Sequence, residues 1–255
     1  MGRALDVKAY LERIDYRGPT APTAATLRAL HVGHLRAVPF ENLSIHAGQP
    51  VVLEDARLFE KIVAGRRGGF CYELNGLFAA LLRALGFEVR MLSAGVAREG
   101  GGFGPEFDHM ALVVELEERW LADVGFGDSF REPLRLDERD EQRQGKSAYR
   151  IRPEGHRLVL ERRDGGGEWK PQYSFTLRPR AYADYAEMCR HHQTSPESHF
   201  TRGRVCTRAT DGGGRVTLSE LRLITTDPEG ARHERALSGE EEYADVLREQ
   251  FGVRL

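Results

Sequence analysis

The chain has 255 residues, 40% of them hydrophobic, and a formal net charge of −2 at pH 7. This length can bury a sizeable core in one large domain or in two to three small lobes, and the near-balanced charge excludes a broad electrostatic attraction to nucleic acid or membrane. Charges interrupt the first 30 residues, so no signal peptide is expected, and no stretch reaches the roughly 20 apolar residues that cross a bilayer. Three cysteines make no disulfide framework in a chain this long, so we expect free thiols in the cytoplasm.

The first third of the sequence predicts helices. Apolar residues recur at helical spacing in 6–14, 23–38 and 53–63, and Pro39 ends the second of these segments. A further helix is expected from Cys71, directly after Gly68-Gly69-Phe70, to Gly86, with one deeply buried face. In the first turn of a helix the dipole and the free N–H groups favour a thiolate, which is the nucleophilic form of cysteine.

After Gly86 the sequence predicts an antiparallel barrel or open sheet, followed by a mixed helix and strand region. Short segments rich in β-forming residues alternate there with glycine-rich turns. The expected strands are 87–96, 109–116, 120–126, 149–152, 158–162, 173–177, 204–208, 215–225 and 233–236. Helices are expected over 179–192 and from a capping box at 238–241 to about residue 251. The fold class is therefore α+β.

Two polar residues interrupt the apolar strands. His109 begins one strand, and Asp123 lies within the segment from Trp120 to Gly127. A cysteine nucleophile needs a base such as histidine, and the base needs an orienting group such as a carboxylate. However, a cysteine beside an apolar helix face is most often a core residue, and a histidine or aspartate at a strand end is most often structural. The residue pattern alone leaves both interpretations open.

The strand register adds a geometric condition. If Glu117 and Glu118 form a two-residue turn, His109 pairs with Phe126, and Asp123 then points to the opposite face of the sheet. The two side chains share a face only if the turn has an odd number of residues or one strand carries a bulge.

Several motifs, in order, closely resemble those of the arylamine N-acetyltransferases. They are 67–75 around Cys71, 38–43 upstream of it, 108–110 around His109, 123–127 after Asp123, 195–200, and 251–253 near the C-terminus. The resemblance runs from about Tyr10 to the C-terminus. It implies a Cys71–His109–Asp123 triad in a cysteine-protease-like core, and three lobes: a helical bundle (1–86), a β-barrel (87–192) and an α/β lid (193–255).

The resemblance also implies a reaction. Cys71 would take acetyl from acetyl-CoA as a thioester and pass it, in a ping-pong mechanism, to an arylamine, arylhydrazine or arylhydroxylamine in xenobiotic metabolism. His109 would pair with the thiolate and accept the amine proton, and Asp123 would fix the imidazole tautomer. The alternatives are an amide synthase or other acyltransferase with a different donor or acceptor, and a thiol hydrolase.

Further positions follow by match. Phe126 lies where the family shapes the acceptor pocket, and Phe40 and Val96 are assigned to the same pocket. The loop with Gly102, Phe103 and Gly104 lies where the family contacts acetyl-CoA, although a plain hairpin turn is an equal interpretation. We also expect Arg67 and Glu73 to form an ion pair near the thiol, and Asn75 to hydrogen-bond the backbone.

No metal site is expected. Cys189, His191 and His192 are grouped only by composition, and His31 and His34 are better explained as core or solvated residues than as a chelating pair. The predicted partners are acetyl-CoA and a small amine or hydrazine, with no nucleic acid and no membrane, and the protein is expected to be a monomer or homodimer.

Overall fold

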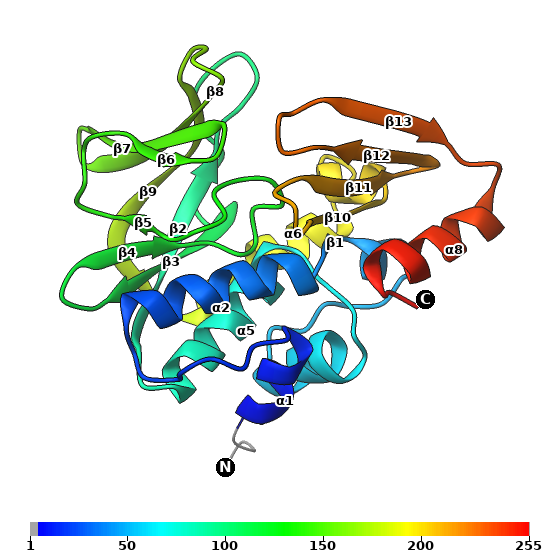
Figure 1. The fold of residues 1–255 in the computed structure, drawn as a ribbon, viewed down its shortest axis with the longest axis horizontal. Coiled ribbons are helices and arrows are strands. Elements are labelled where there is room, and N and C mark those ends of the chain that lie inside the picture. The colour runs from blue at the N-terminus through cyan, green and yellow to red at the C-terminus, as the bar shows by residue number, and fades with distance from the viewer. Residues whose placement is uncertain (1–4, 255) are drawn as a thin grey trace.

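A computed structural model describes residues 5–254 of the protein. Figure 1 shows helices at the bottom, a barrel at the upper left and a second sheet at the upper right. This arrangement confirms the expected α+β fold class. The N-terminal helices are α1 (Val7–Arg13), α2 (Ala24–Ala37), α3 (Leu43–His46), α4 (Asp55–Phe59), which continues into the π-helical turn η1 (Glu60–Ala64), and α5 (Cys71–Ala84).

Helix α5 lies at the centre of the largest core. Eleven of its 14 residues are buried, because the other helices cover one side and strands β2 (Glu88–Val96) and β3 (His109–Glu115) the other. Full burial of a leucine or phenylalanine side chain contributes about 1.5–3 kcal/mol. The helix start is thereby held rigidly inside the protein.

The barrel contains eight antiparallel strands in the order β5-β4-β3-β2-β9-β8-β7-β6. Side chains bring its two edges together, because the amides of Gln142 and Gln144 on β6 bond backbone groups of residues 131–135 at 2.7–3.0 Å. The strands are β2 (Glu88–Val96), β3 (His109–Glu115), β4 (Arg119–Ala122), β5 (Leu134–Arg135), β6 (Gln142–Gln144), β7 (Ser147–Glu154), β8 (Arg157–Asp164) and β9 (Lys170–Arg180).

The register of β3 and β4 meets the condition set by the sequence. Leu112 pairs with Ala122 and Glu115 with Arg119, so three residues, Leu116 to Glu118, form the turn. This odd turn brings Asp123 opposite Ala111, on the same face as His109. The strand expected over 120–126 ends at Ala122, directly before Asp123.

The C-terminal sheet has the order β1-β10-β11-β12-β13. Its edge strand β1 comes from the N-terminal region, where Phe40 pairs with Thr207 and Glu41 with Cys206. The segment 215–225, predicted as one strand, is a hairpin that turns at Glu220, whose φ is +47°. The strands are β1 (Phe40–Glu41), β10 (Val205–Ala209), β11 (Arg215–Ser219), β12 (Arg222–Thr226) and β13 (Arg232–Ala236).

Helix α8 (Glu240–Phe251) packs on this sheet. The predicted capping box is off by one residue, because both the N–H and the hydroxyl of Ser238 donate to Glu242 (2.7 and 2.8 Å). Gly239 is the residue that precedes the helix.

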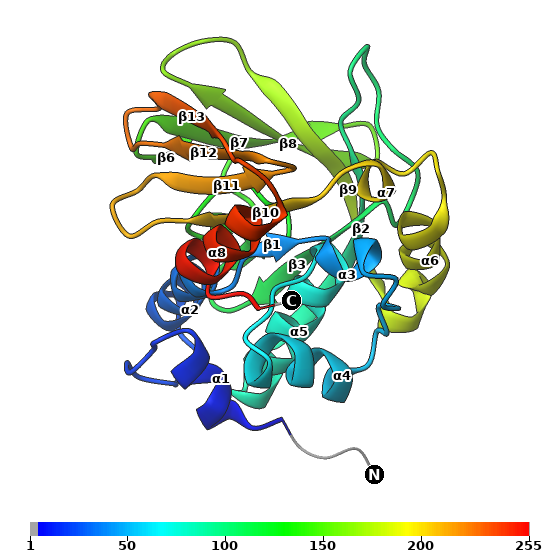
Figure 2. The ribbon, with the colours of Figure 1, turned by 90° about the vertical axis from the view of Figure 1, so that its right-hand side faces the viewer.

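In the sequence, three short helices connect the two sheets. They are the 3₁₀-helix η2 (Tyr182–Tyr185) and helices α6 (Ala186–Thr194) and α7 (His199–Arg202). Figure 2 shows α6 and α7 at one edge of the molecule. The expected helix over 179–192 thus begins later, because β9 extends to Arg180. Cys189 and Phe200 from these helices join the core around α5. The division of the chain at 86/87 and 192/193 stays a prediction. Among residues 5–254, no helix is both long and apolar enough to cross a membrane.

Candidate active site

Cys71 is the first residue of α5, and the two glycines before it allow this position. The chain at Gly69 runs beside β1, and the Glu41 N–H donates to the Gly69 carbonyl at 2.9 Å. A Cβ at Gly69 would stand 2.6 Å from Glu73 Oε2, which itself accepts the N–H of Phe70 at 3.1 Å. A larger residue there would therefore displace the carboxylate that caps the helix.

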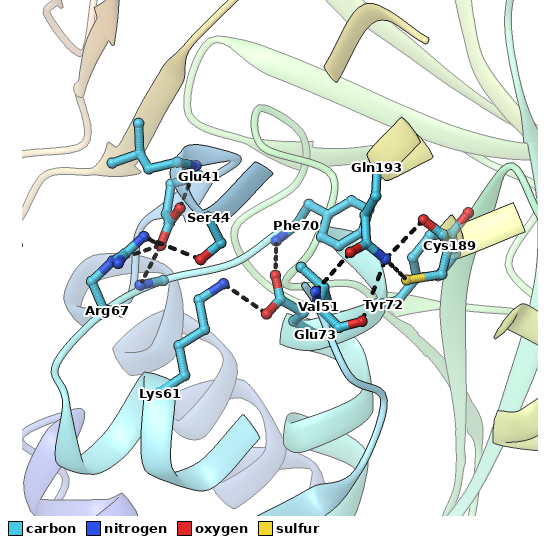
Figure 3. A network of polar contacts seen from close by, with 12 residues as sticks. Glu41, Ser44, Val51, Lys61, Arg67, Phe70, Tyr72, Glu73, Cys189 and Gln193 are labelled. Carbon is cyan, nitrogen blue, oxygen red and sulfur yellow. Dashed lines mark hydrogen bonds and ion pairs between the residues drawn. The ribbon is translucent and has the colours of Figure 1, made fainter. Parts of the chain in front are cut away.

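The ion pairs beside the thiol differ from the expected Arg67–Glu73 pair (Figure 3). Glu73 contacts Lys61 at 2.7 Å, and Arg67 contacts Glu41 at 3.0 Å. Glu73 folds back toward Phe70, whereas Arg67 lies before the glycine pair and reaches β1. Burial raises the pKa of Glu73, and the Lys61 ammonium opposes this rise. Both pairs join segments that pack around the start of α5.

His109 and Asp123 form a buried pair. Nε2 of His109 lies 2.7 Å from Oδ2 of Asp123, and the two residues are 3% and 2% exposed. Burial disfavours the carboxylate of Asp123, but His109 and the hydrogen bonds from Asn75 and Gly125 outweigh burial and lower its pKa. Because Nε2 is engaged, Nδ1 is the ring nitrogen left to exchange a proton with another group. Within residues 5–254 it has no hydrogen-bond partner.

Two residues connect this pair to the start of α5. Asn75, one turn after Cys71, donates to Asp123 Oδ1 at 2.9 Å and to the Met110 carbonyl at 2.6 Å, and accepts the N–H of Val124 at 2.9 Å. Gly125 donates its N–H to Asp123 Oδ1 at 2.9 Å. The expected backbone hydrogen bonding of Asn75 is therefore confirmed, and it extends to the side chain of Asp123.

Gly125 packs closely against the nucleophile candidate, Cys71. A Cβ at Gly125 would stand 2.8 Å from the Cα of Cys71. The segment after Asp123 therefore packs directly on the backbone of Cys71. Gly125, which also bonds Asp123, thereby brings the His109–Asp123 pair to the start of the Cys71 helix.

The ionisation of Cys71 departs from the sequence prediction. The residue is only 3% exposed, and burial raises the pKa of its thiol well above the usual value, although the Met110 backbone N–H lowers it. Asp123 and Asp108 raise the pKa further. No hydrogen bond joins the sulfur to His109 in the part of the chain described. Burial of the sulfur therefore opposes the thiolate form that a helix start favours.

Sequence reasoning missed the role of His31. Its Nε2 accepts the N–H of Asp123 at 3.1 Å, and its Nδ1 lies 2.7 Å from the Arg131 carbonyl, which fixes an Nδ1–H tautomer. Burial lowers the pKa of His31 to about 4. His34 instead contacts the Tyr10 hydroxyl at 2.9 Å. The two histidines do not converge, and residues 5–254 contain no group of side chains suited to a metal ion.

Tyr173 on β9 is a second residue without a sequence signal. Its ring centroid lies 5.1 Å from that of His109 and 5.3 Å from that of Phe126. Burial and the Asp123 carboxylate raise the pKa of its phenol. Tyr173 and Phe126 thus enclose the imidazole with aromatic rings.

Phe126 and Phe40, assigned to one pocket from sequence, line the same cavity of about 360 Å³ against the C-terminal sheet. The Phe126 ring also lies edge-on to the His109 ring, at 5.2 Å. Val96 lies at the end of β2 and is not among the residues lining this cavity. The acceptor-pocket assignment of all three residues stays a prediction.

The loop containing Gly102, Phe103 and Gly104 is a tight hairpin extension of β2 and β3. The Gly104 N–H donates to the Val96 carbonyl at 2.7 Å, and Phe103 bridges Ala97. At Gly102 the φ angle is +75°, a value that glycine adopts readily. A contact of this loop with acetyl-CoA stays a prediction.

The whole chain is similar to known proteins in sequence. A sequence profile described as N-acetyltransferase matches residues 23–255. The arylamine N-acetyltransferase of Escherichia coli (strain K12) is 35% identical over 96% of this chain and 87% of its own. The one from Mycolicibacterium smegmatis is 36% identical over 99% and 93%.

Solved structures resemble the whole chain. The arylamine N-acetyltransferase from Salmonella typhimurium has a TM-score of 0.92 at 32% identity, with 98% of this chain and 92% of that one covered. The Mycobacterium marinum arylamine N-acetyltransferase in complex with CoA has a TM-score of 0.89 at 34% identity, with 97% and 93% covered. The profile match and near-full-length identities show that the chain belongs to the arylamine N-acetyltransferase family.

Proposed function

We propose that the protein is an arylamine N-acetyltransferase that carries acetyl from acetyl-CoA to an aromatic amine, hydrazine or hydroxylamine on Cys71. The observation that carries this proposal is the connection of the buried His109–Asp123 pair to the start of the Cys71 helix. Asn75 supplies this connection through its hydrogen bonds at 2.6–2.9 Å, and Gly125 through close packing on Cys71. Family membership supports the acyl donor.

In the first half-reaction the thiol proton of Cys71 passes to Nδ1 of His109 as the sulfur attacks the acetyl carbonyl. Because burial favours the neutral thiol, we place proton transfer and attack in one step. The carbon–sulfur bond to CoA then breaks, and the CoA sulfur takes the proton from His109. One thioester replaces another, so the exchange is nearly isoenergetic. Asp123 stabilises the transient imidazolium through Nε2.

In the second half-reaction the amine nitrogen attacks the thioester on Cys71. His109 accepts a proton from that nitrogen and returns it to the cysteine sulfur as the amide leaves. Aromatic amines suit this step because they are weakly basic and therefore neutral near pH 7. Phe126 and Phe40 give the adjoining cavity an aromatic lining that fits such a ring.

The test is the mass of the intact protein after incubation with acetyl-CoA in the absence of an acceptor. We expect one acetyl group on Cys71, and its release as an N-acetyl product when an aromatic hydrazine is added. Cys71→Ser should lose both signals, whereas Cys189→Ser, which alters another buried free thiol, should keep them. Absence of the acetyl adduct on the wild-type protein would refute the thioester mechanism. Release of acetate to water in preference to the hydrazine would indicate a hydrolase.

A further inference from the structure

Phe107, two residues before His109, has a backbone conformation that bulky residues rarely adopt. Its φ angle is +66°, in the left-handed region that glycine and asparagine tolerate better than aromatic residues. Backbone strain of this kind persists only where the surrounding structure holds it, and it is common at functional sites. The reason for this conformation therefore lies in the contacts that the Phe107 backbone makes.

Two hydroxyl groups hold the Phe107 backbone, one on each side. The Phe107 N–H donates to Oγ of Ser93 on β2 at 2.6 Å. The Phe107 carbonyl accepts the hydroxyl of Tyr72 at 2.5 Å, and the Asp108 carbonyl lies 3.3 Å from the same hydroxyl. Tyr72 is fully buried and Ser93 is 5% exposed, so water competes little for either side chain. Both polar groups of this strained residue are therefore fixed by the protein.

Tyr72 is itself held firmly, and it follows Cys71 directly in α5. Its carbonyl accepts the hydroxyl of Tyr182 at 2.9 Å, and its ring stacks on that of His192 with 6.1 Å between the centroids. Burial raises the pKa of the Tyr72 phenol, so the hydroxyl stays protonated and can donate. This hydroxyl therefore connects the residue after the nucleophile candidate to the segment just before His109.

The connection through Tyr72 differs from the one through Asn75. Asn75 donates to Asp123, and Asp123 bonds Nε2 of His109, so that route orients the imidazole ring. The Tyr72 hydroxyl instead acts on the backbone at residues 107 and 108, from which the His109 side chain extends. A catalytic side chain needs both its ring and its backbone fixed for a productive geometry.

We propose that Tyr72 is a positioning residue, whose hydroxyl, together with Ser93, holds Phe107 in the left-handed conformation and thereby keeps Nδ1 of His109 directed at Cys71. The inference rests on the proposed transfer of the Cys71 proton to His109. Because Tyr72 is fully buried, its hydroxyl affects the rate of that transfer and not the binding of the acetyl donor.

The first experiment measures single-turnover acetylation of Cys71 over a range of acetyl-CoA concentrations. Tyr72→Phe keeps the ring and removes the hydroxyl, so it should lower the rate at saturation about tenfold, the effect of one lost hydrogen bond. The half-saturating concentration of acetyl-CoA should stay unchanged. Ser93→Ala should change the rate in the same direction.

Tyr10→Phe is the matched control. Tyr10 on α1 is also fully buried, and its hydroxyl lies 2.9 Å from Nδ1 of His34. This variant also loses one buried hydrogen bond, but it should keep the wild-type acetylation rate. Equal slowing by Tyr10→Phe and Tyr72→Phe would show a general loss of stability and contradict the positioning role.

A double variant tests whether the hydroxyl acts through Phe107. Asparagine adopts positive φ angles more readily than phenylalanine, so residue 107 should depend less on Tyr72 in Phe107→Asn. Adding Tyr72→Phe to Phe107→Asn should therefore cost about threefold or less in rate, against about tenfold in the wild-type background. Equal losses in the two backgrounds, or a normal rate in Tyr72→Phe, would overturn the proposal.

Alkylation of Cys71 by iodoacetamide separates this proposal from the proposed function, because it needs no acetyl-CoA. The rate is measured from about pH 5 to pH 9 for the wild type, Tyr72→Phe and His109→Gln, which lacks the base. The Tyr72→Phe profile should shift toward that of His109→Gln, whereas a purely structural role would leave the profile in place. This shift in a protein that acetyl-CoA never acetylates would refute the acetyl donor and keep the positioning role. A Tyr72→Phe profile identical to the wild-type profile would refute the positioning role.

Discussion

Replacing Asn75 by alanine should disconnect the Cys71 helix from the His109–Asp123 pair. The side chain is fully buried and makes three hydrogen bonds, one of them to the Asp123 carboxylate. A hydrogen bond to a charged group contributes about 1.5–3 kcal/mol, and leaving a buried backbone group unsatisfied costs about 1–3 kcal/mol. We therefore expect the free energy of unfolding to fall by about 3–5 kcal/mol.

The acylation rate should fall as well. If the bond from Asn75 to Asp123 orients the carboxylate in the transition state, its loss should slow acetylation of Cys71 about 10- to 100-fold. The assay is the single-turnover rate with acetyl-CoA, measured well below the melting temperature of the variant. Urea unfolding of the same sample gives the stability change.

Asn42 provides the matched control. It is also buried, and its amide makes three hydrogen bonds with the backbone, to the carbonyls of Phe200 and Gly203 and from the N–H of Val205, at 2.7–2.9 Å. Asn42→Ala should lose similar stability and keep a near-wild-type acylation rate. If Asn42→Ala slows acylation as much as Asn75→Ala, or if Asn75→Ala acylates normally, the positioning role of Asn75 is wrong.

Three further predictions test packing and protonation. Gly125→Ala should lower the free energy of unfolding by about 2 kcal/mol and slow the acetylation of Cys71, because the new Cβ would stand 2.8 Å from Cys71 Cα. Gly212→Ala is the control, because open space surrounds that position, and it should change neither quantity. Urea unfolding and the acylation assay measure the two effects. As the pH falls below 6.5, His31 takes up a proton in the unfolded chain but stays neutral in the folded protein until about pH 4. The free energy of unfolding should therefore fall by roughly 3 kcal/mol across that interval because of His31. Urea unfolding from pH 7 to 4 measures this loss, and a flat profile would contradict it. Burial raises the pKa of Cys206, so above about pH 8.5 only the unfolded chain loses the thiol proton. The free energy of unfolding should then fall by up to about 1.4 kcal/mol per pH unit. A plot of this free energy against pH should be less steep for Cys206→Ala than for the wild type, and identical slopes would refute this.

The elements that carry the site could be predicted from periodicity, but their mutual geometry could not. Apolar spacing placed Cys71 at a helix start and His109 at a strand start, and both positions are confirmed. The position of Asp123 relative to His109 depends on whether the turn has two or three residues. The sequence Leu116-Glu117-Glu118 is compatible with either, and the pairing of the whole strands decides between them.

Partners distant in sequence explain the remaining differences. Glu73 and Arg67 are close in the chain and were expected to pair, but each contacts a residue from another segment, 12 positions away for Lys61 and 26 for Glu41. The pKa of Cys71 differs from the sequence prediction for the same reason. A helix start is visible locally, whereas burial of the thiol results from several elements that pack over it.

The two-residue strand β1 constrains the order in which the protein assembles. Phe40 pairs with Thr207, so most of the chain lies between the two strands, while the neighbouring Glu41 N–H bonds the Gly69 carbonyl before the nucleophile helix. Contacts between such distant segments form late, because a long loop must close first. During synthesis, β1, which lies beside the segment before Cys71, can therefore pair with β10 only after β10 has left the ribosome. We expect nascent chains that end before Val205 to hold the helix without a finished catalytic site.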